Sequence, residues 1–245
     1  KGSVLDTITD MALLRQHAED YGLTLTDDQK SAITEAASKF ISDNGSVAKW
    51  IGADQTSVEE MLSLMTYQEL MYDKVIEDTD RDVSDEEAAQ STILYAYQSL
   101  TVPSDYEGTE EEYPEEVKKN MEDLLEKIKA AEDGETDIDS VQALAEEISD
   151  SITVSEISYG KDDTSPDEKV IEAASGLEDG EVYDGLVETD TAIYIVKMEL
   201  VFDEEATEEE IDSIISQRES DKYTETLESW NSAAEVTTEK IWDSL

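Results

Sequence analysis

The chain has 245 residues, of which 65 are acidic and 17 basic, so its formal net charge is −48. A field of this sign repels phosphate backbones and anionic lipid surfaces, and we therefore expect neither nucleic acid nor an anionic membrane as a partner. Because the chain has no cysteine and only one histidine, it lacks the residues for thiol chemistry, cysteine metal sites and Ser-His or Cys-His catalysis.

The N-terminal part of the chain shows helical periodicity. Thr26-x-x-Gln29 and Thr56-x-x-Glu59 are capping-box signatures, and each stands just before a run of apolar residues at helical spacing. The second run is rich in methionine, which suits an adaptable client surface but is more often plain core. We therefore expect a helical segment over residues 1–87.

A sheet-forming region follows. The β-branched and aromatic run at 93–100 predicts a strand, and so does the alternating run at 152–159. Between them, Pro114 opens a strongly amphipathic stretch and a second apolar repeat spans 138–148, which predicts two helices. The acidic stretch at 103–113 contains glycine and proline and predicts a loop.

The stretch from Pro166 to Leu200 is the most informative part of the chain. Pro166 suits the first turn of a helix, and apolar residues at helical spacing follow it. A strand-like run at 182–187, with its glycine as a bulge, precedes a polar turn and a second strand at 192–198. This order resembles the C-terminal half of a parvulin-type peptidyl-prolyl isomerase domain. The residues that match its motif are Leu177, Gly180, Glu181, Val182, Ile195 and Lys197. The alternative is an unrelated α+β hairpin unit.

After Leu200 the pattern is helical again. Thr207-x-x-Glu210 is a further capping-box signature, and the apolar residues up to Trp230 predict one long helix. Helices, a parvulin-like domain and a long helix ending in Trp230-x-x-x-Ala234 resemble the extracytoplasmic foldases of the PrsA and SurA type. In that family the two ends of the chain combine into one helical chaperone domain, and the isomerase domain is inserted between them.

The resemblance implies an α+β fold in three consecutive parts. Residues 1–87 are expected to form a helical N-terminal chaperone segment. Residues 88–202 are expected to form a parvulin-like domain with a four-stranded antiparallel sheet and flanking helices. Residues 203–245 are expected to form a C-terminal helix and tail that pack with the N-terminal segment, because neither terminal segment alone has enough apolar surface for a stable core.

The family also implies where a site would lie. A parvulin site has two histidines on adjacent strands and a methionine and a phenylalanine that form the proline pocket, and it uses no cofactor or metal. By motif, Gln98 and Tyr194 stand at the two histidine positions, and we expect their side chains on one face of the sheet. Thr164 and Glu168 stand at the two pocket positions, and Tyr159 belongs to the aromatic-glycine-basic turn of the same region.

These replacements change what the site is expected to do. The two residues at the histidine positions can still hydrogen-bond to one another. The pocket loses more, because burying a phenylalanine or methionine contributes about 1.5–3 kcal/mol, and the Glu168 carboxylate would have to be desolvated to receive an apolar ring. We therefore expect weak or absent isomerase activity. A slip of one residue in strand register would bring Tyr97 and Ile193 together instead.

Three functions are left open. The favoured one is an extracytoplasmic folding factor, secreted or lipid-anchored at the cell surface, that holds unfolded or newly secreted polypeptides. The others are an active but divergent prolyl isomerase and an acidic cell-surface binding protein that keeps only the scaffold. Because the chain opens at Lys1 without a methionine, we expect that a targeting segment was removed. A lipid anchor upstream and a homodimer are further open alternatives.

Overall fold

The structure, a computed structural model, describes residues 2–131 and 136–237. By its internal contacts the chain forms two compact units, one made of Lys1–Arg81 with Ile215–Leu245 and the other of Asp82–Ile214. The first is called the helical unit here, and the second the sheet unit. Each unit is described by itself. No helix among the described residues is both long enough and apolar enough to cross a membrane.

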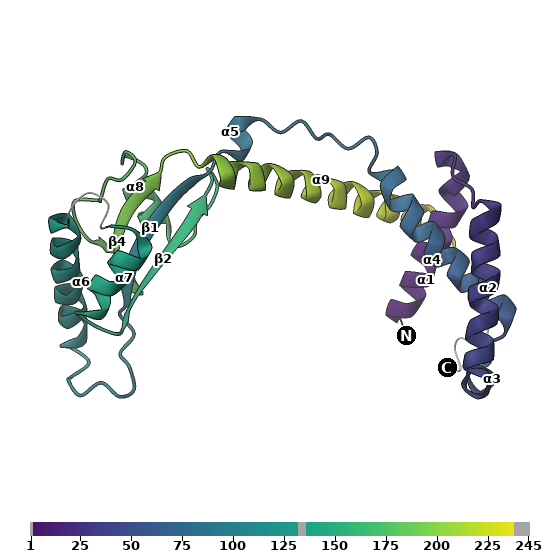
Figure 1. The fold of residues 1–245 in the computed structure, drawn as a ribbon, viewed down its shortest axis with the longest axis horizontal. Helices are drawn as coiled ribbons and strands as arrows, with labels where there is room; N and C mark the ends of the chain where they lie inside the picture. The colour runs from purple at the N-terminus through teal and green to yellow at the C-terminus, as the bar shows by residue number, and fades with distance from the viewer. Residues whose placement is uncertain (1, 132–135, 238–245) are drawn as a thin grey trace. The chain divides into compact units, whose positions relative to one another are not determined.

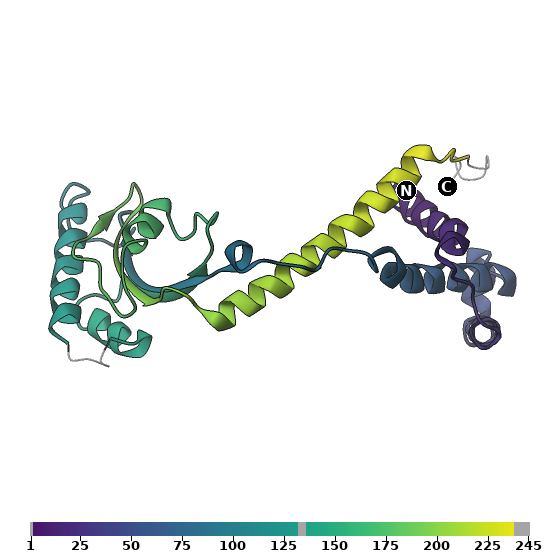
Figure 2. The same ribbon diagram turned by 90° about the horizontal axis from the view of Figure 1, so that it is seen from above.

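The helical unit is built from both ends of the chain (Figure 1). Its elements are α1 (Gly2–His17), η1 (Ala18–Tyr21), α2 (Asp27–Asp43), α3 (Gly45–Ile51), α4 (Gln55–Val75) and the C-terminal part of α9 (Glu204–Ala233). Figure 2 shows α9 as one unbroken helix, which begins in the sheet unit and ends in the helical unit. The last part of the predicted tail, residues 238–245, lies outside the described residues.

Two helix starts in this unit show how the sequence sets the boundaries. The predicted capping box of Thr26 and Gln29 is confirmed, because each side chain accepts the backbone N–H of the other residue. The second predicted capping box, at Thr56, is wrong. Helix α4 begins directly after Asp54, whose side chain accepts the Ser57 N–H at 2.8 Å. Aspartate is a strong N-cap and its charge suits the positive end of the helix, so the cap lies upstream of Thr56.

The core of the helical unit contains residues from both chain ends. Its fully buried side chains are Leu14, Ala18, Met71 and Val75. From α9, Tyr223, Leu227 and Trp230 pack against this cluster. The methionine-rich stripe of α4 is therefore core only in part, since Met71 is fully buried whereas Met61 and Met65 are 39% and 49% exposed.

The sheet unit combines helices with one antiparallel sheet. Its elements are α5 (Asp85–Ala88), β1 (Ser91–Ser99), α6 (Tyr113–Ala130), α7 (Ile138–Glu146), β2 (Ile152–Tyr159), α8 (Glu168–Ala174), β3 (Val187–Glu188), β4 (Ala192–Leu200) and the start of α9. The four strands lie in the order β2-β1-β4-β3, and each neighbouring pair is antiparallel. The predicted fold class, with a four-stranded antiparallel sheet and flanking helices, is confirmed.

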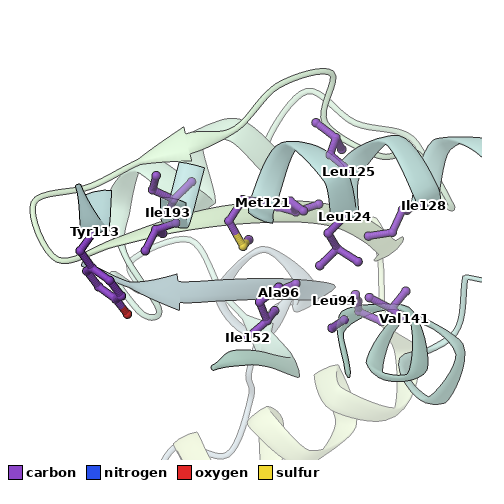
Figure 3. Close-up of a cluster of buried hydrophobic side chains, with 13 residues drawn as sticks. Leu94, Ala96, Tyr113, Met121, Leu124, Leu125, Ile128, Val141, Ile152 and Ile193 are labelled. Carbon is purple, nitrogen blue, oxygen red and sulfur yellow. The ribbon is translucent and has the colours of Figure 1, made fainter. Parts of the chain in front are cut away.

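One face of the sheet is covered by α6 and α7 (Figure 3). From the two central strands, this face receives Leu94, Ala96, Ile193 and Ile195. The helices add Val117, Met121, Leu124, Leu125, Ile128, Val141 and Ala145. Helix α6 has a proline in its first turn, as Pro114 predicts. Its apolar stripe explains why it packs flat on the strands.

On the opposite face, α8 packs against β4 and β3. From β1 and β4 this face receives Ile93, Tyr95, Tyr97, Tyr194, Val196 and Met198, and from α8 it receives Val170 and Ala174. Because side chains alternate along a strand, the two faces take alternate residues of the same two strands. The face on which a residue of β1 lies is therefore fixed by the register of β1 against its neighbours.

Two helix starts in the sheet unit also lie at aspartates. Helix α8 was expected to begin at Pro166, but its N-cap is Asp167, whose side chain accepts the Lys169 N–H at 2.9 Å. Helix α9 begins at Glu204 rather than at the predicted box of Thr207, because the Asp203 carboxylate accepts a backbone N–H of the first turn at 3.0 Å. Thr207, the predicted capping residue of α9, therefore lies within the helix and not at its start.

The two edges of the sheet differ in length. Strand β2 forms one edge along eight residues, whereas β3 forms the other edge with only two. The predicted strand at 182–187 is therefore wrong in extent, since Val182 joins the sheet by a single bridge to Lys197. In the segment between Val182 and Val187, Tyr183 donates its N–H to Val196 of β4 at 2.9 Å, and Lys129 donates to the Asp184 carboxylate at 2.6 Å.

Candidate functional site

The register of β1 and β4 decides which predicted site residues meet. Tyr97 lies opposite Tyr194, and Gln98 lies opposite Ile193. Directly opposite residues of an antiparallel pair share a face, so Gln98 and Tyr194 lie on opposite faces of the sheet. The expectation that they share a face is wrong by one residue in β1. The alternative pair, Tyr97 with Ile193, does not form either, because Tyr97 pairs with Tyr194 and Ile193 pairs with Gln98.

The residues that the structure does bring together are three tyrosines on the α8 face. The ring centroids of Tyr97 and Tyr194 are 5.5 Å apart at an interplanar angle of 24°. Tyr95 lies 6.1 Å from each of the other two rings. These separations are typical of favourable aromatic pairs. We call Tyr95, Tyr97 and Tyr194 the tyrosine cluster.

The tyrosine cluster is only partly covered. Tyr194 is 8% exposed, while Tyr95 and Tyr97 are half-buried, so their rings remain accessible from the α8 side. Burial raises the pKa of the Tyr194 hydroxyl, and the charges of Asp167 and the neighbouring tyrosines raise it further. The Tyr194 hydroxyl is protonated at neutral pH, as an ordinary tyrosine is, and can donate a hydrogen bond.

The residues at the family's pocket positions lie in different environments. Tyr159 ends β2 and is buried in the same apolar cluster as Tyr194. Burial raises the pKa of its hydroxyl. Thr164 and Glu168 are exposed, Thr164 in the loop before α8 and Glu168 in the first turn of that helix. Among the described residues, neither has a hydrogen bond or ring contact to the tyrosine cluster. Their part in a proline pocket stays a prediction.

Gln98 lies on the other face of the sheet, under α6. It is 2% exposed, and its Oε1 accepts from Asn120 Nδ2 of α6 at 3.2 Å. Because Gln98 lies on this face, its side chain cannot contact a ligand bound at the tyrosine cluster. In the part of the chain that the structure describes, no group of three or more His, Cys, Asp or Glu side chains is placed to hold a metal ion.

Tyr95 was missed as a site residue and Tyr97 was named only as the outcome of a register slip, although the sequence contains the signal for both. The run Tyr95-Ala96-Tyr97 alternates two aromatic residues around one small residue, which is the pattern of a strand with both rings on one face. Counting from the family motif favoured Gln98 instead. The alternation alone would have placed Tyr97, and not Gln98, on the face of the other tyrosines.

No family model matches the chain, and no curated protein matches it. Among solved structures, the foldase protein PrsA from Streptococcus pneumoniae is 19% identical, with 97% of this chain and 87% of that chain covered and a TM-score of 0.37. PrsA from Lactococcus lactis is 15% identical, with 96% and 85% covered and a TM-score of 0.40. The peptidylprolyl isomerase PrsA from Bacillus anthracis is 15% identical, with 96% and 100% covered and a TM-score of 0.33. The chain is similar to these structures, but at these values the function has to be argued from the residues of the site.

Proposed function

We propose that the protein is a folding factor that binds unfolded or newly secreted polypeptides outside the cytoplasm, and that its sheet unit has weak or no isomerase activity. The observation that supports this best is the tyrosine cluster, with Tyr97 and Tyr194 stacked at 5.5 Å on an accessible sheet face. Aromatic surfaces of this kind dock extended, proline-containing segments, because the rings pack against the flat pyrrolidine. The location, a lipid anchor and the family are proposed from the sequence resemblance.

Weak catalysis is expected from what surrounds the tyrosine cluster. Rotation about an X-Pro amide meets a barrier of roughly 18–20 kcal/mol, so a catalyst has to bind the twisted amide more tightly than the planar one. An enclosed apolar pocket for the proline ring would supply that difference. Thr164 and Glu168, at the family's pocket positions, are exposed and polar. A flat aromatic surface binds the planar and twisted forms alike, and uniform binding does not lower the barrier.

The helical unit offers a second surface for clients. Its exposed apolar side chains include Val47, Trp50 and Ile51 of α3 and Met61 and Met65 of α4. Trp50 is 85% exposed. The stretch 44–53 around it contains no acidic residue, in a chain whose net charge is −48. Exposed apolar side chains mark interaction surfaces, and methionines adapt to varied partners. The same surface would serve a homodimer, which is the alternative occupant.

An active but divergent isomerase is the second candidate, and one observation favours it. The Tyr194 hydroxyl, at a family histidine position, lies in the tyrosine cluster, and like an ordinary tyrosine it carries its proton at neutral pH. It could donate a hydrogen bond to the amide as it twists. The third candidate, an acidic cell-surface binding protein that keeps only the scaffold, would bind neither unfolded clients nor X-Pro peptides.

Two measurements on the full chain separate these candidates. Light scattering of an unfolded client during dilution from denaturant reports holding activity, and we expect the chain to delay aggregation. Proline-limited refolding reports isomerase activity, and we expect a rate close to the uncatalysed one. Tyr97→Leu keeps an apolar side chain but removes one aromatic ring, so it should weaken the holding of proline-rich clients. Tyr106→Leu, which removes a half-buried ring packed against the opposite face of the sheet unit, is the matched control.

The outcomes are distinct. Rapid proline isomerisation that is lost in Tyr194→Phe would replace the proposal with the second candidate. An absence of any effect on aggregation, together with a refolding rate close to the uncatalysed one, would leave only the third candidate. If Tyr97→Leu and Tyr106→Leu weaken holding equally, then the tyrosine cluster is not the client surface of the sheet unit.

A further inference from the structure

Strand β2 leaves part of its backbone without a partner in the sheet. It forms an edge, and among the described strands it pairs with β1 alone. In an antiparallel pair, the backbone groups of successive residues point alternately toward and away from the neighbouring strand. Every second residue of β2 therefore directs its N–H and C=O out of the sheet, and the register against β1 decides which residues these are.

The outward residues are Val154, Glu156 and Ser158. Directly after β1, the Leu100 N–H donates to Thr191 on the β4 side of the sheet. Counting back in steps of two, the even-numbered residues of β1 bond toward β4 and the odd-numbered ones toward β2. The odd-numbered residues of β1 pair with Thr153, Ser155, Ile157 and Tyr159. In the described part of the chain, the N–H and C=O groups of the three outward residues have no hydrogen-bond partner.

These outward groups match the backbone of an extended polypeptide. An extended segment also presents an N–H and a C=O on one side at every second residue, so it can add to the four-stranded sheet as a further strand beside β2. Side chains leave this edge open, since Thr153, Glu156 and Ser158 are exposed. The other edge is less suited, because β3 has only two residues whereas β2 has eight.

The charge of β2 decides which segment it accepts. The strand, ITVSEISY, contains one charged residue, Glu156, near its centre. Residues directly opposite one another on neighbouring strands share a face, so the residue of an added strand that lies opposite Glu156 is beside its carboxylate. A basic residue there forms a favourable cross-strand pair, whereas an acidic residue is repelled. A second copy of the chain is disfavoured, because it has the same net charge of −48.

We propose that the edge of β2 binds a basic, extended segment of an unfolded polypeptide, with an arginine or lysine opposite Glu156. The proposal rests on the proposed function, because it names the conformation and the charge of the clients that the folding factor holds. The added strand also extends the face on which the tyrosine cluster lies. On that face Tyr97 pairs with Thr153 and Tyr95 pairs with Ser155, so only short side chains separate the edge from these two rings.

A pair of labelled peptides tests the charge requirement. The parent is a short peptide of alternating threonine and valine with a central arginine and fluorescein at one end. Its partner has the neutral analogue citrulline in place of the arginine. Binding to the full chain is measured by fluorescence anisotropy at low ionic strength. We expect the arginine peptide to bind about threefold more tightly, a ratio that added salt reduces.

Two N-methylated forms of the parent peptide test the strand geometry. One has methyl groups on the arginine nitrogen of the backbone and on every second residue from it, and the other has them on the residues between. Only one of these two sets of N–H groups can face β2. One form should therefore bind at least about tenfold more weakly than the parent, and the other within about twofold of it.

The protein should show the same alternation. In amide exchange followed by NMR, the N–H groups of Val154, Glu156 and Ser158 should become slower when the parent peptide binds. Those of Ser155 and Ile157 should change little, because they already bond to β1.

Charge reversal then locates the peptide. Glu156→Lys should reverse the preference, so that a peptide with a central glutamate binds more tightly than the arginine peptide. Glu172→Lys is the matched control. It makes the same change of charge on α8, which packs against β4 and β3, and should leave the preference for arginine in place.

Equal effects of the two lysine variants would overturn the proposal, because they would mean that only the long-range field attracts the peptide. Equal binding of the arginine and citrulline peptides, equal loss from both methylated forms, or no binding at a peptide concentration on the order of 1 mM would overturn it as well. Slow exchange of the outward amides in the free chain, together with a dimer in sedimentation, would assign the edge to a second copy instead.

None of these results concerns the delay of client aggregation, which tests the proposed function. Conversely, a chain that binds the arginine peptide along β2 but does not delay aggregation would keep the edge site and refute the folding factor.

Discussion

Asp203 ties the start of α9 to β1 within the sheet unit. Its Oδ2 accepts the Thr92 hydroxyl at 2.6 Å, and its Oδ1 accepts the Ala206 N–H at 3.0 Å. Thr92 is 2% exposed, so its hydroxyl depends on protein partners rather than on water. Replacing Asp203 by alanine removes the N-cap of a 30-residue helix and one acceptor of a buried hydroxyl in a single change.

The expected cost follows from these two losses. Removing an aspartate N-cap costs about 0.5–2 kcal/mol and losing a hydrogen bond to a charged group about 1.5–3 kcal/mol. Because Asp203 is half-buried and water replaces part of both bonds, we expect about 2 kcal/mol in total, near the lower limit of the sum. Hydrogen exchange of backbone amides in β1 and β4 should then become about 30-fold faster, while amides of the helical unit keep their rates.

The matched variant is Asp203→Asn, which keeps a capping oxygen and loses the charge. The hydrogen bond from Thr92, together with backbone N–H groups, lowers the pKa of Asp203. A lowered folded-state pKa contributes stability that is present above the unfolded value of about 3.9 and is lost as pH falls through the folded value. The difference between wild type and Asp203→Asn should therefore close below about pH 4. Unchanged exchange in Asp203→Ala, or a difference that grows in acid, would refute this reasoning.

Leu14→Ala should lower the unfolding free energy of the helical unit by about 2–5 kcal/mol, because the side chain is fully buried. Urea unfolding followed by the fluorescence of Trp230, which packs on the same core, measures it. Gly22→Ala should cost about 1 kcal/mol, because Gly22 has a φ of 66°. Gly176→Ala, where a Cβ meets open space at ordinary φ, is its control. In an alkaline absorbance titration, one tyrosine should ionise at about pH 12, and Tyr106→Phe should remove that step.

Patterns that depend on neighbours in sequence predicted the elements well. The capping box at Thr26, the proline-started helix at Pro114 and the strand at 152–159 are found where the sequence places them. Apolar periodicity also predicted the two helices on one face of the sheet. These signals are local, because each depends on hydrogen bonds or alternation within a few residues.

The misplaced helix starts share one physical reason. Threonine signatures at Thr56 and Thr207 were read as caps, but Asp54 and Asp203 lie just upstream and take that role. Aspartate accepts the first-turn N–H as well as threonine does and gains from the helix dipole. In a chain with 65 acidic residues, an aspartate is often available near each helix start, so the capping position is ambiguous in sequence.

Gln98 and Tyr194 lie on the two neighbouring strands that the motif indicates, but not on one face of the sheet. The motif identified β1 and β4, yet a one-residue error in β1 exchanged Tyr97 for Gln98. The pairing register depends on contacts between residues about a hundred positions apart, which no local pattern encodes.

Strand β2 gives the sheet one long edge whose outer backbone groups can pair with another chain. Within the described residues it pairs with β1 alone, and Glu156 lies exposed near its centre. A charged side chain on an edge strand discourages two copies from joining edge to edge, and the net charge of −48 keeps them apart at longer range. The acidic composition of the chain thus protects its solubility. As carboxylates become protonated near about pH 4, that protection fades and self-association through β2 becomes the main hazard for the folded protein.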